Sequence, residues 1–170
     1  GWHAHRQGLD LPQRVTMAEM LREQGYATAL VGKWHLGMQP GRHPLDQGFD
    51  SWLGTKGSND WDGPGVDYRQ FRDTPEAGWQ TPLYRDRETR GVCPQSEFTG
   101  RYTQEAIRLI KHNSDRPFFL YLAHNMPHVP LFASEPFRGK SGNGVFGDVL
   151  LELDHSVGQL IAALEETGLS

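Results

Sequence analysis

An α/β fold, with helices packed on a parallel or mixed β-sheet, is predicted by the order of the regular segments in this sequence. A short helix is followed directly by an apolar strand near residue 30, and the same order returns between residues 99 and 123. A long amphipathic helix follows between residues 146 and 164. Helices that alternate with buried strands are typical of such a sheet. The 170 residues are enough for one domain with a sizeable core.

The first helix and strand are predicted from caps and apolar runs. Thr16 and Glu19 have the spacing of a capping box, and Gly25 is suited to end the helix. The apolar face of this helix is expected to comprise Met17, Met20 and Leu21. Residues 26–31 form an apolar run without polar alternation, which predicts a strand buried on both faces.

Residues 36–98 are rich in glycine, proline, aspartate and tryptophan, and they are expected to form loops with small local elements such as a short hairpin. A plain irregular surface is the alternative. Four aromatic side chains of this region could line a cleft for a sugar or an aryl group, or form a small core of their own: Trp61, Tyr68, Phe71 and Trp79.

The second half repeats the helix–strand order. Apolar spacing predicts a helix over residues 99–113, and the run at 116–123 predicts the second strand. The last helix has apolar residues at spacings of three and four and ends at Gly168. Its acidic residues are expected to form a solvated face: Asp148, Glu152 and Asp154.

Composition excludes some functions. The net charge of −4, the pI near 6.0 and the lack of a basic stripe argue against nucleic-acid binding. No apolar stretch approaches the ~20 residues that span a bilayer. The single cysteine, Cys93, forbids an internal disulfide and leaves the redox compartment open.

Cationic side chains follow both predicted strands. Lys33 and His35 come after the first, and His124 and His128 come after the second. Parallel strands would gather these groups at one carboxyl edge, where ligands of open α/β sheets bind. In extended backbone Lys33 and His35 point to the same side, while Trp34 points the other way and could anchor the segment. A cationic pair suits an anionic substrate such as sulfate or phosphate.

Other motifs fit less well. A phosphate-binding P-loop would need glycine where Ala27 stands and serine or threonine where Trp34 stands. The two histidines after the second strand have the spacing of a helical metal pair, but Pro127 makes a helix there unfavourable. A calcium loop at residues 58–63 would need a carboxylate where Arg69 stands.

Taken together, the motifs resemble the sulfatase family. "GYATALVGKWHLG", residues 25–37, matches every fixed position of the family's second signature, G-Y-x-T-x-x-x-G-K-x-H. The segments "HPLDQGFDSWLG", "RPFFLYLAHNMPHVPLF" and "GVFGDVLLELDHSVGQLIAALEETGL" also look like arylsulfatases, and "GWHAHRQG" resembles the stretch just past their nucleophile. The resemblance implies an alkaline-phosphatase-like sheet with helices on both faces, incomplete in this chain. Residues 1–170 would then be one partial catalytic domain.

The resemblance also implies roles. Sulfatases hydrolyse sulfuric esters with a formylglycine nucleophile and a calcium ion. Lys33 would contact the formylglycine and the sulfate, and His35 would bind the hydrated aldehyde and help to eliminate sulfate. His128 would face the leaving-group oxygen as general acid and bind substrate, and Ser58 would bind sulfate. His124 has no counterpart in this pattern.

The nucleophile motif C-x-P-S-R is absent, and Cys93 in "VCPQS" does not match it. The Ca2+ ligands of the family are also expected outside these residues, so no metal ligand is assigned. The partner would be a small-molecule or glycan sulfate ester, and the family resemblance favours a periplasmic, secreted or lysosomal protein. A phosphodiester or phosphonate hydrolase of the same superfamily and a non-catalytic anion-binding relative are the alternatives.

Overall fold

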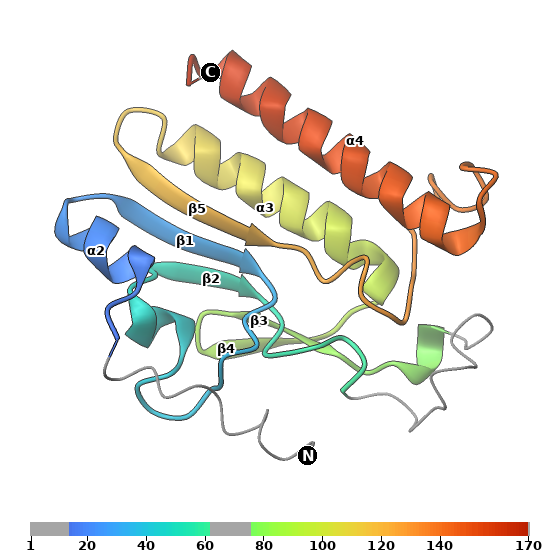
Figure 1. Ribbon diagram of the computed structural model, residues 1–170, viewed down its shortest axis with the longest axis horizontal. Coiled ribbons are helices and arrows are strands. Elements are labelled where there is room, and N and C mark those ends of the chain that lie inside the picture. Colours follow the sequence, from blue (N-terminus) through green and yellow to red (C-terminus); the bar gives the residue numbers. More distant parts are fainter. Residues whose placement is uncertain (1–13, 62–75, 170) are drawn as a thin grey trace.

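The computed structural model describes residues 14–61 and 76–169, and its centre is a mixed β-sheet (Figure 1). The described strands are β1 (Ala27–Gly32), β2 (Ser51–Gly54), β3 (Pro82–Arg85), β4 (Glu88–Val92) and β5 (Phe118–Ala123). They lie in the order β4-β3-β2-β1-β5. β1 is parallel to both β2 and β5, while β3 pairs antiparallel with β2 and β4. The predicted strands at 26–31 and 116–123 are therefore confirmed as parallel neighbours.

Helices cover both faces of this sheet, as predicted (Figure 1). The described helices are α2 (Met17–Glu23), α3 (Phe98–His112) and α4 (Gly144–Glu166), with short 3₁₀ helices η1 (Pro44–Gln47), η3 (Glu76–Gly78) and η4 (Gln95–Glu97). α3 packs on the face that contains Val31 and Leu53, and α2 packs on the face that contains Leu30 and Trp52. α4 packs mainly against α3, as an outer layer. No described helix is long and apolar enough to cross a membrane.

The capping box of α2 is confirmed, but its predicted apolar face is wrong. Glu19 N–H donates to Thr16 Oγ1 at 3.1 Å, and Thr16 N–H donates back to the Glu19 carboxylate at 2.7 Å. Met17 and Met20 are 64% and 57% exposed, whereas Ala18 is buried. The reason is the close approach of Gly48, where an added Cβ would lie 2.2 Å from Glu19 N. This helix packs through its backbone rather than through long apolar side chains.

α4 corrects a second expectation. Asp148 and Glu152 are buried rather than solvated, because their carboxylates accept hydrogen bonds from the preceding loop. Ser141 N–H donates to Asp148 Oδ1 at 3.0 Å, and Ser134 N–H donates to Glu152 Oε2 at 2.9 Å. Asp154 is exposed, as expected. Half of the predicted apolar stripe is exposed on the outer side of α4: Phe146, Leu150, Val157 and Ile161.

The region 36–98 contains more of the sheet than predicted. The expected hairpin is β3–β4, but β2 also lies here and pairs with β1 along its parallel edge. A strand of four residues is too short to show a periodic pattern in the sequence. Trp79 is buried, while Tyr68 and Phe71 lie outside the described residues.

Candidate active site

The segment after β1 lies between the ends of two neighbouring strands. Lys33 N–H donates to Ala123 O at the end of β5, at 2.7 Å. His35 N–H donates to Lys56 O beyond β2, at 3.0 Å. Gly32 makes this close fit possible, because its φ is +113° and an added Cβ would lie 1.9 Å from Ala123 O. The backbone therefore fixes Lys33 and His35 at the carboxyl edge of the parallel strands.

Trp34 anchors this segment, as predicted. Its side chain is buried beside Phe49, with ring centroids 6.1 Å apart. Its indole N–H donates to Gly37 O at 2.8 Å and to Arg42 O at 2.9 Å. The expected extended geometry ends at His35, whose φ is +63°. A non-glycine residue in this left-handed region is strained and is held there by its surroundings.

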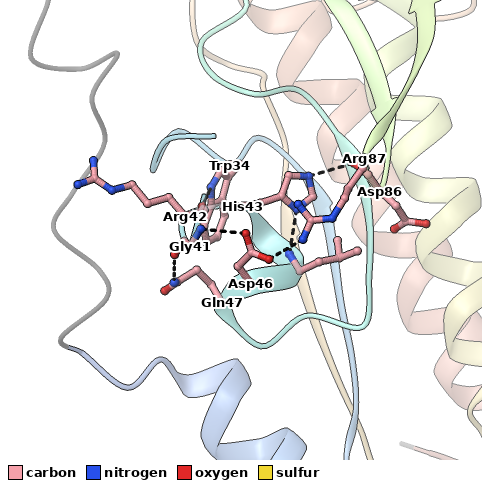
Figure 2. Close-up of polar contacts among 9 residues, drawn as sticks. Trp34, Gly41, Arg42, His43, Asp46, Gln47, Asp86 and Arg87 are labelled. Atoms are coloured by element: carbon pink, nitrogen blue, oxygen red, sulfur yellow. Dashed lines mark hydrogen bonds and ion pairs between the residues drawn. The ribbon is translucent and has the colours of Figure 1, made fainter. Parts of the chain in front are cut away.

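His43 and Asp46 brace the loop behind Trp34 (Figure 2). Leu45 N–H donates to His43 Nδ1 at 3.2 Å, so the proton of the neutral ring lies on Nε2, which donates to Asp86 O at 3.1 Å. Burial lowers the pKa of His43, and the Arg87 guanidinium lowers it further. Asp46 accepts from Gly41 N–H and pairs with Arg87. The loop is thereby tied to the β3–β4 hairpin.

Trp52 connects this brace to the end of β1. Its indole N–H donates to Gly32 O at 3.1 Å, immediately before Lys33. The His43 ring meets the Trp52 indole edge-to-face, with centroids 5.3 Å apart. Trp52 is fully buried, so this contact is rigid. Sequence reasoning did not find Trp52 or His43, although both belong to the segment that resembles arylsulfatases.

Ser58 and His128 are in direct contact. Ser58 Oγ lies 3.2 Å from His128 Nε2 and 3.3 Å from Nδ1. His128 Nδ1 also lies 2.5 Å from Val129 O, and because a carbonyl only accepts, Nδ1 carries a proton. Nε2 is then the nitrogen that can exchange a proton with a ligand. His128 is exposed and Ser58 is buried, so the pair opens to solvent on the histidine side.

A buried polar network holds the Ser58 and His128 loops together. Asn59 Nδ2 donates to Gln95 Oε1 at 2.8 Å and to Pro130 O at 3.1 Å. Asn125 Nδ2 donates to Thr55 Oγ1 at 3.0 Å. Asn59, Gln95 and Asn125 are all buried. These residues were missed by sequence reasoning, because their partners are far apart in the chain.

The Lys33 ammonium group is partly desolvated and lies near a carboxylate. Burial lowers the pKa of Lys33, while the nearby Asp60 carboxylate opposes this decrease. Asp60 follows the Ser58 loop, so Lys33 is electrostatically coupled to the segment that contacts His128. His35 reaches the same segment through Trp61, with ring centroids 4.8 Å apart and an edge-to-face geometry. A partly desolvated ammonium group gains charge stabilisation when an anion binds beside it.

His124 lies at the end of β5 but faces the helices. Its Nε2 lies 3.3 Å from Ser156 Oγ on α4, and its ring lies 6.0 Å from that of Tyr102 on α3. Its Nδ1 is buried with no hydrogen-bond partner. Burial lowers the pKa of His124 to about 4. It is therefore a neutral packing residue rather than part of the Lys33 group.

The described residues contain no group of three or more histidine, cysteine, aspartate or glutamate side chains that could hold a metal. The part of the chain that the structure describes therefore provides no site for the calcium ion that the resemblance implies. Cys93 is buried, and burial raises the pKa of its thiol. It thus lacks the environment of an activated nucleophile.

A cavity of about 500 Å³ adjoins the histidines. Its wall includes Ser58, which contacts His128, and Trp61, which contacts His35. Of the four aromatic residues considered from the sequence, Trp61 lines this cavity and Trp79 is buried. Tyr84 of β3 adds a second aromatic ring to the wall.

Comparison with known proteins gives concordant results. The model of the family described as Sulfatase matches residues 5–170. N-acetylgalactosamine-6-sulfatase of Canis lupus familiaris is 39% identical over 170 residues, covering 93% of this chain and 31% of that protein. Arylsulfatase A of Homo sapiens is 39% identical over 176 residues, covering 96% of this chain and 34% of that protein. The chain therefore spans about a third of the length of these curated relatives.

The fold is also similar to solved structures. The crystal structure of Ps i-CgsB in complex with k-i-k-neocarrahexaose has a TM-score of 0.69 and 25% sequence identity. The match covers 96% of this chain and 41% of that chain.

Proposed function

Because the chain belongs to the sulfatase family, we propose that the complete protein hydrolyses sulfuric esters. Its mixed sheet with helices on both faces is the alkaline-phosphatase-like fold that the family resemblance implied. The observation that carries the proposal is the Ser58–His128 contact beside the β1 end that presents Lys33 and His35. Together they offer a fixed cation, a hydroxyl and a proton-exchanging nitrogen to one tetrahedral anion.

Lys33 supplies charge in this proposal. Cleavage of a sulfate ester builds negative charge on the sulfuryl oxygens and on the leaving oxygen. The Lys33 backbone is fixed by the Gly32 turn and by its own N–H, which donates to Ala123 O. Its half-buried ammonium group stabilises the first of these charges without a large reorganisation. Burial lowers the pKa of Lys33, and the nearby Asp60 carboxylate opposes this decrease.

His128 supplies the proton for the leaving oxygen. With Nδ1 directed at Val129 O, Nε2 is available to donate to the ester oxygen once it is protonated. Ser58 Oγ lies 3.2 Å from Nε2 of this ring and supplies a hydroxyl donor for a sulfate oxygen. His35, held at φ +63° against Trp61, is placed to bind a second oxygen of the reacting group.

A calcium ion and a formylglycine would supply charge neutralisation and the nucleophile in a sulfatase of this type. The described residues do not form a site for the ion, so neither group is assigned here. This segment contributes the residues that bind the sulfate group and the residue that protonates the leaving oxygen.

We further propose a glycan sulfate as the substrate. One curated relative is named N-acetylgalactosamine-6-sulfatase, and one structural relative was solved with k-i-k-neocarrahexaose. The cavity walled by Trp61 and Tyr84 supports this proposal, because aromatic faces pack well against the apolar faces of sugar rings.

The test compares sulfate with phosphate. The complete protein is assayed with 4-nitrophenyl sulfate and with bis(4-nitrophenyl) phosphate, each with a Lys33→Gln control. We expect sulfate release that the control lacks and little cleavage of the phosphate diester. A preference for the diester would replace this proposal by a phosphodiesterase activity, and binding of sulfate without any turnover would indicate a non-catalytic relative.

A further inference from the structure

The cavity beside Ser58 contains one feature that the proposed reaction does not use. Its described wall is formed by neutral side chains except for one, the ammonium group of Lys56. A cation in a cavity of about 500 Å³ has room for a sugar-sized ligand beside it. No described carboxylate lies within ion-pair distance of Lys56 Nζ, in contrast to the six described ion pairs elsewhere.

The strands fix where Lys56 lies. Tyr84 pairs with Gly54 in the β2–β3 register. Its ring therefore lies between the two side chains that flank Gly54 on the same face, two residues before it and two residues after it. These are Trp52, whose ring is parallel to that of Tyr84 with centroids 5.9 Å apart, and Lys56, whose Nζ lies 4.3 Å from the Tyr84 centroid. The cation–π contact holds the exposed ammonium group at the cavity wall.

Lys56 is also tied to the proposed reaction centre. Its carbonyl accepts the His35 N–H at 3.0 Å, and Ser58 follows two residues later. A sulfate held at Ser58 and His128 would therefore place the rest of its sugar toward Trp61, Tyr84 and Lys56. A neutral aryl or monosaccharide leaving group makes no use of this charge, whereas an anionic neighbour does.

We infer that Lys56, with Tyr84 and Trp61, forms a specificity subsite for a second anionic group of a sulfated glycan, either a uronate carboxylate or a second sulfate. The inference rests on the proposed sulfatase function and adds what that function leaves open, the charge on the part of the substrate that is not cleaved. Lys56 is a positioning and specificity residue in this account, because it does not touch the reacting sulfur.

The experiment uses the complete protein and three substrates: a neutral hexosamine monosulfate, its disaccharide with a neighbouring uronate, and a disulfated hexosamine. The preference is the ratio of kcat/KM between an anionic substrate and the neutral one. We expect Lys56→Gln to lower this ratio about threefold to tenfold. This range corresponds to the free energies of an exposed ion pair and of a hydrogen-bonded ion pair. Lys56→Arg should retain it, and so should Lys140→Gln, which removes an exposed lysine outside the cavity.

The two anionic substrates identify the group that is bound. Only the substrate whose anion Lys56 recognises should have a lower kcat/KM ratio in Lys56→Gln. In the unsubstituted protein the ratio should also fall between about 0.05 and 0.5 M NaCl, because salt screens an exposed pair. A ratio that Lys56→Gln leaves unchanged, or an equal loss on all three substrates, would overturn the subsite.

Failure of the proposed function is distinguished by binding. If no sulfate ester is turned over, the affinity for the desulfated uronate disaccharide and for the disulfated hexosamine is measured by tryptophan fluorescence. If either ligand binds more weakly to Lys56→Gln than to Lys56→Arg, the subsite is still supported. If each ligand binds equally to the two variants, the subsite is refuted.

Discussion

Replacing His124 by phenylalanine should make the protein more resistant to acid. The ring of His124 is enclosed between β5, α3 and α4, and its Nδ1 has no hydrogen-bond partner. Protonation would place a positive charge on this half-buried ring, whose Nδ1 is shielded from solvent. Burial accordingly lowers the pKa of His124 from 6.5 to about 4.

The direction and the size of the pH effect on stability follow from this decrease in pKa. Between pH 6.5 and about 4 the unfolded state binds the proton and the folded state does not, so stability falls as the pH falls. The contribution is fully present above 6.5 and fully lost below about 4. At 1.36 kcal/mol per pH unit, the gap corresponds to roughly 3 kcal/mol of unfolding free energy.

The assay is urea unfolding of the complete protein at several pH values from 7 to 4, followed by tryptophan fluorescence. His124→Phe fills the same space without a titratable nitrogen, and Ser156 keeps its hydrogen bond with Thr103. Between pH 7 and pH 4 the parent should lose roughly 3 kcal/mol more unfolding free energy than His124→Phe loses. His112→Gln, at an exposed position at the end of α3, should follow the parent. Equal acid losses in His124→Phe and the parent would refute the reasoning.

Three further predictions concern the rest of the chain. Gly32→Ala should lower the unfolding free energy by at least about 2 kcal/mol, because its φ is +113° and a Cβ would lie 1.9 Å from the Ala123 carbonyl of β5. Gly158→Ala on α4 is the control for thermal unfolding and should be tolerated, because a Cβ there would meet nothing within 4 Å. Cys93 should remain an unmodified thiol in peptide mapping and react with a disulfide reagent only on unfolding, since it is buried and burial raises its pKa. Residues 1–170 expressed alone should not hydrolyse an aryl sulfate even with calcium, and turnover above that of Lys33→Ala would contradict this.

The parts of the fold that the sequence predicted are those with local signals. The capping box at Thr16 and the apolar runs of β1 and β5 depend on residues close in the chain. The strand-end positions of Lys33 and His128 followed from the same local patterns, whereas Ser58 was assigned from the family resemblance alone, because the strand before it, β2, was not predicted. Parallel pairing of β1 and β5 then brought their carboxyl ends together.

The missed parts depend on distant partners. Asp148 looks like a surface residue until the loop N–H groups that it binds are known. The left-handed backbone of His35 goes with a hydrogen bond to Lys56 O beyond β2, a partner 21 residues further along the chain that the local sequence does not reveal. Lys56 belongs to a region without periodicity, and its place beside Tyr84 follows only from the β2–β3 register.

The most direct test of the central claim is a leaving-group series with the complete protein. Aryl sulfates of increasing leaving-group pKa are compared for the parent, His128→Ala and Lys33→Ala. A general acid matters most when the leaving oxygen is basic, so His128→Ala should lose about 10²- to 10⁴-fold on poor leaving groups and much less on good ones. Lys33→Ala should lose activity on all of them, because it acts on charge common to every sulfate. Equal losses from His128→Ala across the series would contradict the assignment of the Ser58–His128 pair to proton donation.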